Sequence, residues 1–169
     1  PSRMSYFSIA GIQMPIEPSG DNIAAMGRYA AHVRGRFPWV SMLLFPELAV
    51  FGPDPKRAVP LPGEVEERLC NIARTYGHWL IPGSLFERRG ENIFNTTPVI
   101  APNGTVVARF SKLFPFRPYE QGISAGTEFV VFDVEGAGRF GISICYDMWF
   151  PETTRQMAAM GAEVILHPT

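Results

Sequence analysis

Short apolar runs alternate with amphipathic stretches along the first half of the chain. Apolar, aromatic and β-branched residues fill 6–14, 39–45 and 79–86, which predicts buried strands. Apolar residues recur at helical spacing over 21–36 and 63–76, and each of these stretches is bounded by residues that suit helix ends. We therefore expect strands that alternate with helices in this half.

The second half of the chain is expected to contain paired strands. Asn103-Gly104 separates two β-rich runs and is a strong signal for a tight hairpin turn. The order of strands and helices predicts an α/β fold with α+β character, in which helices cover sheet faces. The expected elements of this half are strands over 92–100, 105–110, 128–134 and 139–144, a helix over 151–160 and a strand over 163–166.

Composition narrows the class of protein. With 169 residues, of which 46% are hydrophobic and 18% charged, the chain fits one globular domain spanning 1–169. A formal net charge of -1 argues against nucleic acid or an anionic membrane surface as a partner, and no apolar run is long enough for a membrane span. The 2 cysteines suggest no disulfide framework, so a cytoplasmic location is expected. The 3 histidines are scattered, so no metal site is expected.

Three polar residues stand at the ends of predicted strands: Glu47, Lys112 and Cys145. Each alone has an ordinary explanation, as a loop acid, a surface lysine or a small core thiol. Together they form a nucleophilic set, because a thiol attacks as its thiolate and needs a base or a nearby cation to form it. Glu47 can accept the proton, and Lys112 can stabilise negative charge on the reacting oxygen. The backbone N–H of Tyr146, at the start of the following helix, can complete an oxyanion site.

The segments around these three residues resemble the motifs of the nitrilase superfamily of carbon–nitrogen hydrolases. Phe45-Pro46-Glu47-Leu48 resembles the glutamate motif of that family, and Phe110-Ser111-Lys112-Leu113 resembles its lysine motif. The sequence GISICYDMWFPE at 141–152 resembles its cysteine motif. The motifs occur in the family's order, with separations of 65 residues (47 to 112) and 33 residues (112 to 145). The resemblance covers about Phe7 to Thr169 and implies a four-layer α-β-β-α sandwich.

The resemblance also implies a role for each residue. Cys145 is expected to be the nucleophile, Glu47 the general base and Lys112 the group that stabilises the tetrahedral intermediate. Glu120 matches a second glutamate that positions substrate or assists proton transfer, and an ordinary loop acid is the alternative reading. The family chemistry needs no cofactor.

The residues after the cysteine indicate the branch of the family. Tyr146-Asp147 followed by Phe150-Pro151-Glu152 resembles the amidase and carbamoylase branches, whereas nitrilases usually carry Trp-Glu there. Our hypothesis is that the protein hydrolyses a small linear carboxylic amide to an acid and ammonia through a cysteine thioester. The alternative is an N-carbamoyl compound hydrolase, which releases carbon dioxide as well as ammonia.

Residues near the motifs are candidates for substrate binding. A carbamoyl amino acid would need a cation for its carboxylate, and Arg117 is the better candidate, with Arg155 a weaker one. Phe116 and Trp149 are candidates for lining the pocket, although core packing is the alternative for aromatic residues. Tyr146 is expected to contribute its backbone N–H as an oxyanion donor.

Chain length motivates a hypothesis from another class, an inactive fragment or a non-catalytic subunit. Family domains usually continue for roughly another hundred residues, so we expect 1–169 to be only the N-terminal part of the sandwich. Residues 1–3 are expected to be an added segment ahead of the protein's own Met4. Family members usually pair through the helix after the nucleophile, so a homo-oligomer through 151–160 is expected.

Overall fold

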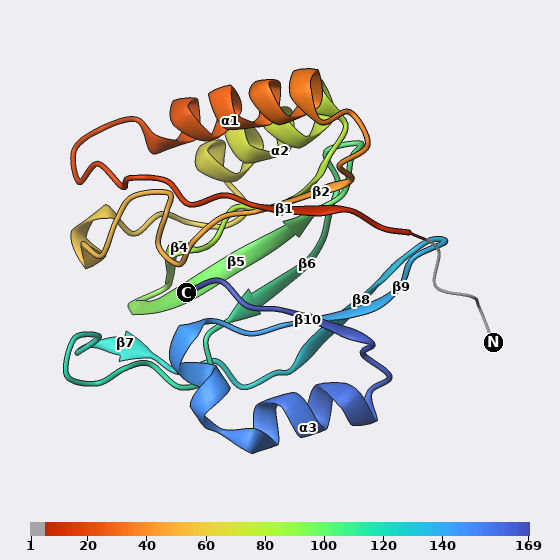
Figure 1. The fold of residues 1–169 in the computed structure, drawn as a ribbon. Coiled ribbons are helices and arrows are strands. Elements are labelled where there is room, and N and C mark those ends of the chain that lie inside the picture. The colour runs from red at the N-terminus through yellow and green to blue at the C-terminus, as the bar shows by residue number, and fades with distance from the viewer. Residues whose placement is uncertain (1–5) are drawn as a thin grey trace.

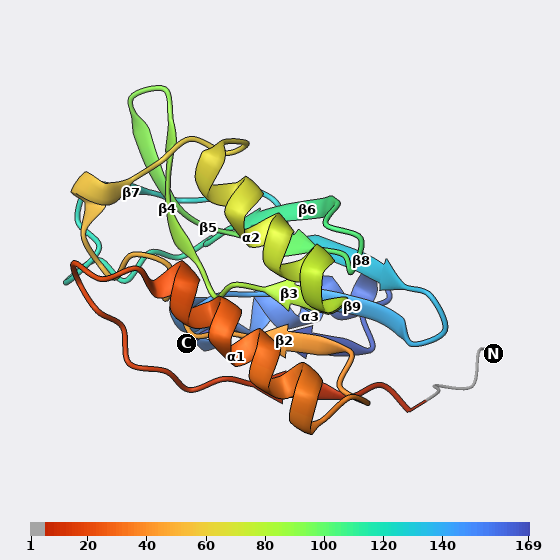
Figure 2. The ribbon, with the colours of Figure 1, turned by 90° about the horizontal axis from the view of Figure 1, so that it is seen from above.

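The chain folds into four layers. A computed structural model describes residues 6–169, and the expectation for the first four residues lies outside that range. Helices α1 (Asn22–Arg36) and α2 (Glu64–Tyr76) lie side by side over one sheet, as Figure 1 and Figure 2 show. Helix α3 (Pro151–Ala159) covers the outer face of a second sheet. The expected α-β-β-α sandwich is thereby confirmed.

The first sheet mixes parallel and antiparallel pairs. Within the described residues it contains seven strands: β1 (Ile9–Gly11), β2 (Met42–Leu44), β3 (Trp79–Ile81), β4 (Leu85–Arg89), β5 (Asn92–Ile100), β6 (Val106–Ser111) and β7 (Ile123–Ser124). Strands β1, β2 and β3 run parallel because α1 and α2 provide the crossovers between them. The long strand β5 pairs antiparallel with β3 and β4, and also pairs with β6 and β7.

The second sheet carries the predicted nucleophile at the end of its central strand. Within the described residues it contains three strands: β8 (Val130–Val134), β9 (Gly138–Ile142) and β10 (Val164–Leu166). Strand β9 pairs antiparallel with β8 and parallel with β10. Two short 3₁₀ helices complete the fold, η1 (Pro55–Arg57) and η2 (Cys145–Trp149). Cys145 therefore opens a helical turn directly after the strand segment.

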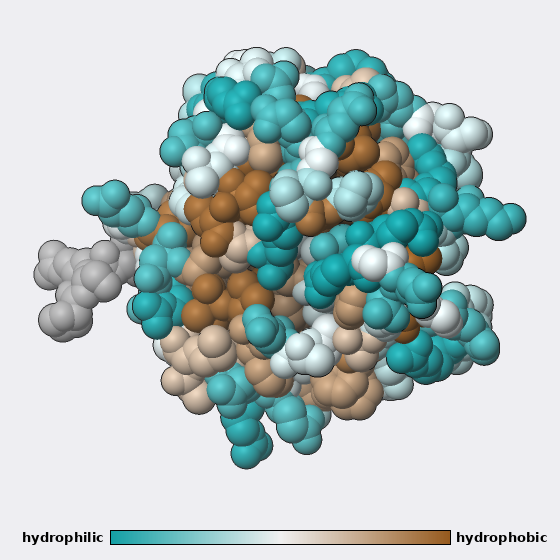
Figure 3. Space-filling model, turned by 180° about the vertical axis from the view of Figure 1, so that it is seen from behind, coloured by the Kyte–Doolittle hydropathy of each residue, from teal (hydrophilic) through white to brown (hydrophobic). Residues whose placement is uncertain are grey.

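Two apolar cores separate the layers. Strand alternation sends Leu43 towards the helices, where it packs in one core with Met26 and Leu69. Its neighbour Met42 points the other way and packs with Phe140 between the two sheets. On the face shown in Figure 3, hydrophobic residues gather at the level of the sheets. No helix in the described part of the chain has the length and apolar character needed to cross a membrane.

The outer helix α3 is packed closely against the second sheet. Met157 is fully buried, and a Cβ at Gly141 of β9 would lie 2.7 Å from its sulfur. Most other side chains of α3 are exposed, including Arg155. Pairing of subunits through this helix stays a prediction.

Two local expectations are wrong, for identifiable reasons. The strand expected over 79–86 is two strands, because Pro82-Gly83 interrupts it. The amphipathic pattern over 63–76 places the acidic residue Glu66 on the polar face of that helix, yet Glu66 is only 3% exposed. It accepts bonds of 2.6 and 2.7 Å from the guanidinium of Arg109 in β6, a partner 43 residues away.

The break between β3 and β4 supports the segment that carries Glu47. Gly83 has φ of 84°, and a Cβ there would lie 1.7 Å from the carbonyl oxygen of Pro46. The next residue, Ser84, accepts a 2.8 Å hydrogen bond at Oγ from the backbone N–H of Leu48. A side chain at position 83 would therefore displace the residues on both sides of Glu47.

We predict that Gly83→Ala lowers the free energy of unfolding by about 2–4 kcal/mol, because it combines a left-handed φ with backbone overlap. Urea unfolding followed by tryptophan fluorescence measures this. Gly11→Ala is the matched control, since nothing lies within 4 Å of a Cβ at that position. Equal unfolding midpoints for the two variants would contradict the prediction.

Candidate active site

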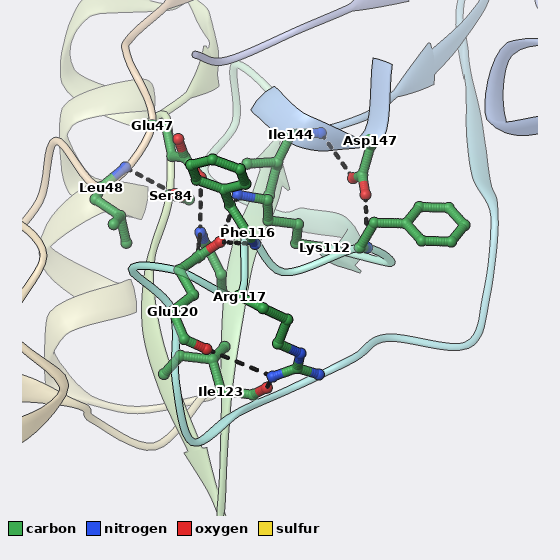
Figure 4. A network of polar contacts seen from close by, with 12 residues as sticks. Glu47, Leu48, Ser84, Lys112, Phe116, Arg117, Glu120, Ile123, Ile144 and Asp147 are labelled. Carbon is green, nitrogen blue, oxygen red and sulfur yellow. Dashed lines mark hydrogen bonds and ion pairs between the residues drawn. The ribbon is translucent and has the colours of Figure 1, made fainter. Parts of the chain in front are cut away.

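Four residues predicted from the sequence meet where strands of both sheets end. Glu47 follows β2, Lys112 follows β6 and Cys145 follows β9, while Glu120 comes from the loop before β7. Figure 4 shows Glu47, Glu120 and Lys112 directed towards one another from these separate segments. The layered fold therefore brings together residues that are up to 98 positions apart, a separation given by positions 47 and 145.

Lys112 is the centre of the polar network. Its side chain is 1% exposed, and Nζ donates to Oε1 of Glu47 and to Oε2 of Glu120, each at 2.7 Å. Burial acts to lower the pKa of Lys112, but the hydrogen bonds to Glu120 and Glu47 outweigh it and raise the pKa above its ordinary value. Lys112 is therefore a buried ammonium held between two carboxylates.

Asn95 joins the same two carboxylates from the strand β5. It is fully buried, and Nδ2 donates to Oε1 of Glu47 and to Oε1 of Glu120, each at 2.9 Å. Glu120 also accepts a 2.7 Å bond from the backbone N–H of Phe116. The sequence reasoning missed Asn95. Its signal was an amide inside a strand whose neighbours Thr96 and Thr97 are also buried.

Cys145 is held in a strained backbone conformation beside Glu47. Its φ is 44°, which is uncommon for a residue other than glycine, and its N–H donates to the carbonyl of Pro168 at 2.8 Å. The backbone N–H of Glu47 donates to the carbonyl of the next residue, Thr169, at 3.4 Å, so Glu47 and Cys145 bond to neighbouring residues of the same segment. Burial raises the pKa of the Cys145 thiol, and Glu47 adds to this rise, while Thr169 and Lys112 act to lower it. The resting sulfur is therefore a thiol that needs a base.

Asp147 ties the cysteine segment to the lysine segment. Its Oδ1 accepts from the backbone N–H groups of Leu113 at 3.1 Å and Phe114 at 2.8 Å, and its Oδ2 accepts from that of Ile144 at 3.0 Å. Burial raises the pKa of Asp147 to about 6, although these three hydrogen bonds act to lower it. The sequence marked Asp147 only as a sign of the family branch, whereas the structure gives it a positioning role.

The other predicted residues surround this network. Tyr146 lies in the first turn of η2, where helix N–H groups have no intrahelical acceptor. Its ring lies 4.9 Å from that of Phe116 and 5.9 Å from that of Trp149, which is 77% exposed. The guanidinium of Arg117 bonds with backbone carbonyls rather than with the carboxylates, and its Nη1 donates to that of Ile123 in β7 at 2.6 Å and to that of Glu120 at 3.4 Å. Among the described residues, no group of three or more His, Cys, Asp or Glu side chains could hold a metal ion.

Comparison with known proteins identifies the family of this chain. Residues 8–169 match the model of the carbon–nitrogen hydrolase family, and the chain belongs to that family. The omega-amidase NIT2 from Homo sapiens is 32% identical over 123 residues, which cover 68% of this chain and 44% of that protein. The N-carbamoylputrescine amidase from Solanum lycopersicum is 37% identical over 119 residues, covering 67% of this chain and 39% of that one.

Solved structures share the fold. An amidase from Nesterenkonia sp. superimposes with a TM-score of 0.87 at 29% sequence identity, and the match covers 99% of this chain and 66% of that chain. A member of the nitrilase superfamily from Saccharomyces cerevisiae superimposes with a TM-score of 0.86. The chain spans about half the length or less of the curated relatives that it matches.

The buried Asp147 predicts a pH dependence of stability. Its pKa of about 6 in the folded state lies above the ordinary 3.8, so the fold favours the protonated form. This contribution is fully present below about pH 4 and is lost as pH rises through about 6. Asp147→Asn stays neutral throughout. The free energy of unfolding of the wild type relative to Asp147→Asn is expected to fall by about 3 kcal/mol over that range.

Urea titrations at a series of pH values measure this difference. Asp133→Asn is the control, because its exposed carboxylate bonds with Arg139 and has a lowered pKa. The wild type should therefore gain stability over that variant as pH rises, which is the opposite sign. A wild-type difference from Asp147→Asn that does not change with pH would refute the assignment.

Proposed function

We propose that the protein hydrolyses a linear carboxylic amide to a carboxylic acid and ammonia. The observation that carries this proposal is the convergence of Cys145 and Glu47 on the adjacent residues Pro168 and Thr169, with Oε1 of Glu47 bonded to the buried Lys112 ammonium. These three groups supply a nucleophile, a base and a fixed positive charge, which acyl transfer requires. Amidases among the similar proteins support the same chemistry.

The first half of the reaction forms a thioester. Glu47 removes the proton from Cys145 as the sulfur attacks the amide carbonyl. The negative charge that develops on the carbonyl oxygen is stabilised by the Lys112 ammonium and by the backbone N–H of Tyr146. As the carbon–nitrogen bond breaks, Glu47 returns its proton to the leaving nitrogen, and ammonia departs.

The second half uses water in place of the amide. Glu47, again a carboxylate, takes a proton from a water molecule that attacks the thioester carbonyl. The tetrahedral intermediate collapses, the carboxylic acid leaves, and the proton on Glu47 returns to the Cys145 sulfur. Glu120 keeps Lys112 in place through its 2.7 Å bond and presents a second carboxylate to the substrate nitrogen. Apart from the substrate and water, both halves use only groups of this chain.

Aromatic rings beside the nucleophile are proposed to contact the acyl group. The ring of Tyr146 lies 5.2 Å from that of Phe150, in addition to its contacts with Phe116 and Trp149. These rings can bury an apolar acyl group, but they offer no charge that could pair with a charged one. The surface therefore favours apolar substrates. In the similar Nesterenkonia amidase, one mutant shows Michael addition of acrylamide at the active-site cysteine. This supports Cys145 as the reactive residue beside the rings.

A second candidate is hydrolysis of an N-carbamoyl compound. It is supported by the 37% identity to the tomato N-carbamoylputrescine amidase. If the substrate is a carbamoyl amino acid, Arg117 would bind its carboxylate, but only with donors other than the Nη1 that holds Ile123. The non-catalytic alternative requires that neither reaction occurs.

We predict that Cys145→Ala lowers ammonia release from short and aromatic amides by roughly 10³-fold or more, because no other group can form the thioester. Enzyme-coupled ammonia detection across the amide panel measures this. Cys70→Ala is the matched control, since that thiol lies on α2, is 4% exposed in the core and is outside the site. Wild-type rates in Cys145→Ala would sink the mechanism, and an inactive wild type on every substrate would favour the non-catalytic subunit.

The gas released separates the two enzymatic candidates. An amide gives ammonia alone, whereas a carbamoyl compound gives ammonia and carbon dioxide in equal amounts. We predict turnover of amides with ammonia as the nitrogen product and no carbon dioxide above background. Parallel ammonia and carbon dioxide assays on amides and carbamoyl amino acids measure this, and faster turnover of the carbamoyl series with paired release would favour the second candidate.

A further inference from the structure

Asn95 occupies a fully buried position of β5 between the two carboxylates of the site. We propose that Asn95 is a positioning residue that fixes Oε1 of Glu47 and thereby presents the other oxygen, Oε2, to the thiol of Cys145. This inference rests on the proposed function of Glu47 as the base, and it adds the residue that determines which carboxylate oxygen accepts the proton.

The hydrogen bonds of Glu47 show which of its two carboxylate oxygens is occupied. Its Oε1 accepts from Nζ of Lys112 at 2.7 Å and from Nδ2 of Asn95 at 2.9 Å. A carboxylate oxygen has two lone pairs in its plane, so these two donors occupy Oε1. Oε2 is therefore the oxygen that remains to accept the proton of the Cys145 thiol. Lys112 alone would leave a lone pair on Oε1 open and the carboxylate free to turn.

The hydrogen bonds of Glu120 show how the single amide of Asn95 can hold the Glu47 carboxylate in one orientation. Glu120 divides its oxygens, with Oε1 accepting from Asn95 at 2.9 Å and Oε2 accepting from Lys112 at 2.7 Å. The two donors and two carboxylates therefore close a ring, in which each carboxylate is bonded to both Asn95 and Lys112. A closed ring limits the rotation of both carboxylates, and precise placement of reacting groups is a large part of catalysis.

The orientation of the Asn95 amide follows from its partners. Two carboxylate acceptors require the nitrogen, not the oxygen, on their side. The oxygen Oδ1 then points away, and it is buried with no hydrogen-bond partner among the described residues. An unpartnered buried oxygen opposes folding. The position is thus occupied at a cost to stability, which fits a residue placed for its two N–H donors.

The charges around Glu47 explain why the donor is a neutral one. Lys112 supplies one positive charge to two carboxylates, and Cys145 develops negative charge during attack. The imidazole of His167 also acts on the site electrostatically, and burial lowers its pKa. Asn95 adds two hydrogen bonds without adding charge, so Lys112 remains the sole cation in contact with the carboxylates among the described residues.

The test compares Asn95→Ala with the wild type in the full chain. Loss of the two N–H donors frees the Glu47 carboxylate to turn and disfavours its ionised form. We expect kcat on the best amide to fall by about 10- to 100-fold with KM changed less than about threefold. We also expect the acid limb of the pH–rate profile to move about one unit higher. A purely structural role would lower the folded fraction and leave the profile in place.

Two further variants keep the test decisive. Thr97→Val alters the same face of β5, where the hydroxyl makes only a 3.3 Å bond to the carbonyl of Pro98, and should keep the wild-type profile. Asn95→Asp keeps the size of the side chain but turns an oxygen towards both carboxylates, and should lose more activity than Asn95→Ala. Wild-type kcat in a folded Asn95→Asp, or an unmoved acid limb in Asn95→Ala, would overturn the proposal.

A second readout separates this inference from the proposed function. Iodoacetamide alkylation of Cys145 needs the base but no amide turnover, and Cys145→Ala corrects for labelling of Cys70. The acid limb of alkylation should move to higher pH in Asn95→Ala as well. If it moves while no amide is hydrolysed, the proposed function fails and the positioning role stands. If it does not move while amides are hydrolysed, the positioning role fails alone.

Discussion

A single buried ammonium constrains the whole arrangement. Lys112 is 1% exposed, and an unpaired charge at that depth would cost several kcal/mol of folding free energy. Glu47 and Glu120 remove that cost, but only if the end of β2, the end of β6 and the loop before β7 converge on one point. The pairing thus couples the geometry of the candidate site to the strand order of the first sheet, because moving any of these segments away would leave a buried charge without a partner.

Hydrogen bonds hold the chain on both sides of Cys145, the proposed nucleophile. On one side, Asp147 binds Ile144 together with the segment that follows Lys112. On the other, the residues after β10 run beside the strand end, with the N–H of Cys145 donating to Pro168 at 2.8 Å. These bonds maintain the positive φ of Cys145, a strain that an isolated turn would relieve. The strained backbone at Cys145 therefore depends on the folded second sheet rather than on the local sequence.

Sequence patterns predicted what depends on near neighbours. The ends of α1 and α2 and the hairpin of β5 and β6 follow from caps, turns and periodicity, whereas the order of layers and the three motif residues follow from family resemblance. The patterns failed where a partner distant in the sequence determines the position or the role of a side chain. Glu66 turns inward because Arg109 meets it, and Asn95 matters because two carboxylates from other segments reach it. Neither partner can be read from the residues that flank these positions.

The electrostatics of the site favour a thiol that reacts only when a substrate is in place. Burial and Glu47 both raise the pKa of Cys145, and the nearby Lys112 is already bonded to two carboxylates. A standing thiolate is therefore disfavoured, and negative charge on sulfur is best formed as the carbonyl is attacked. In the proposed reaction, charge then passes from sulfur to the carbonyl oxygen, where the Lys112 ammonium can stabilise it. In that reaction binding energy acts on the transition state rather than on a resting ion pair, which is the condition for raising kcat.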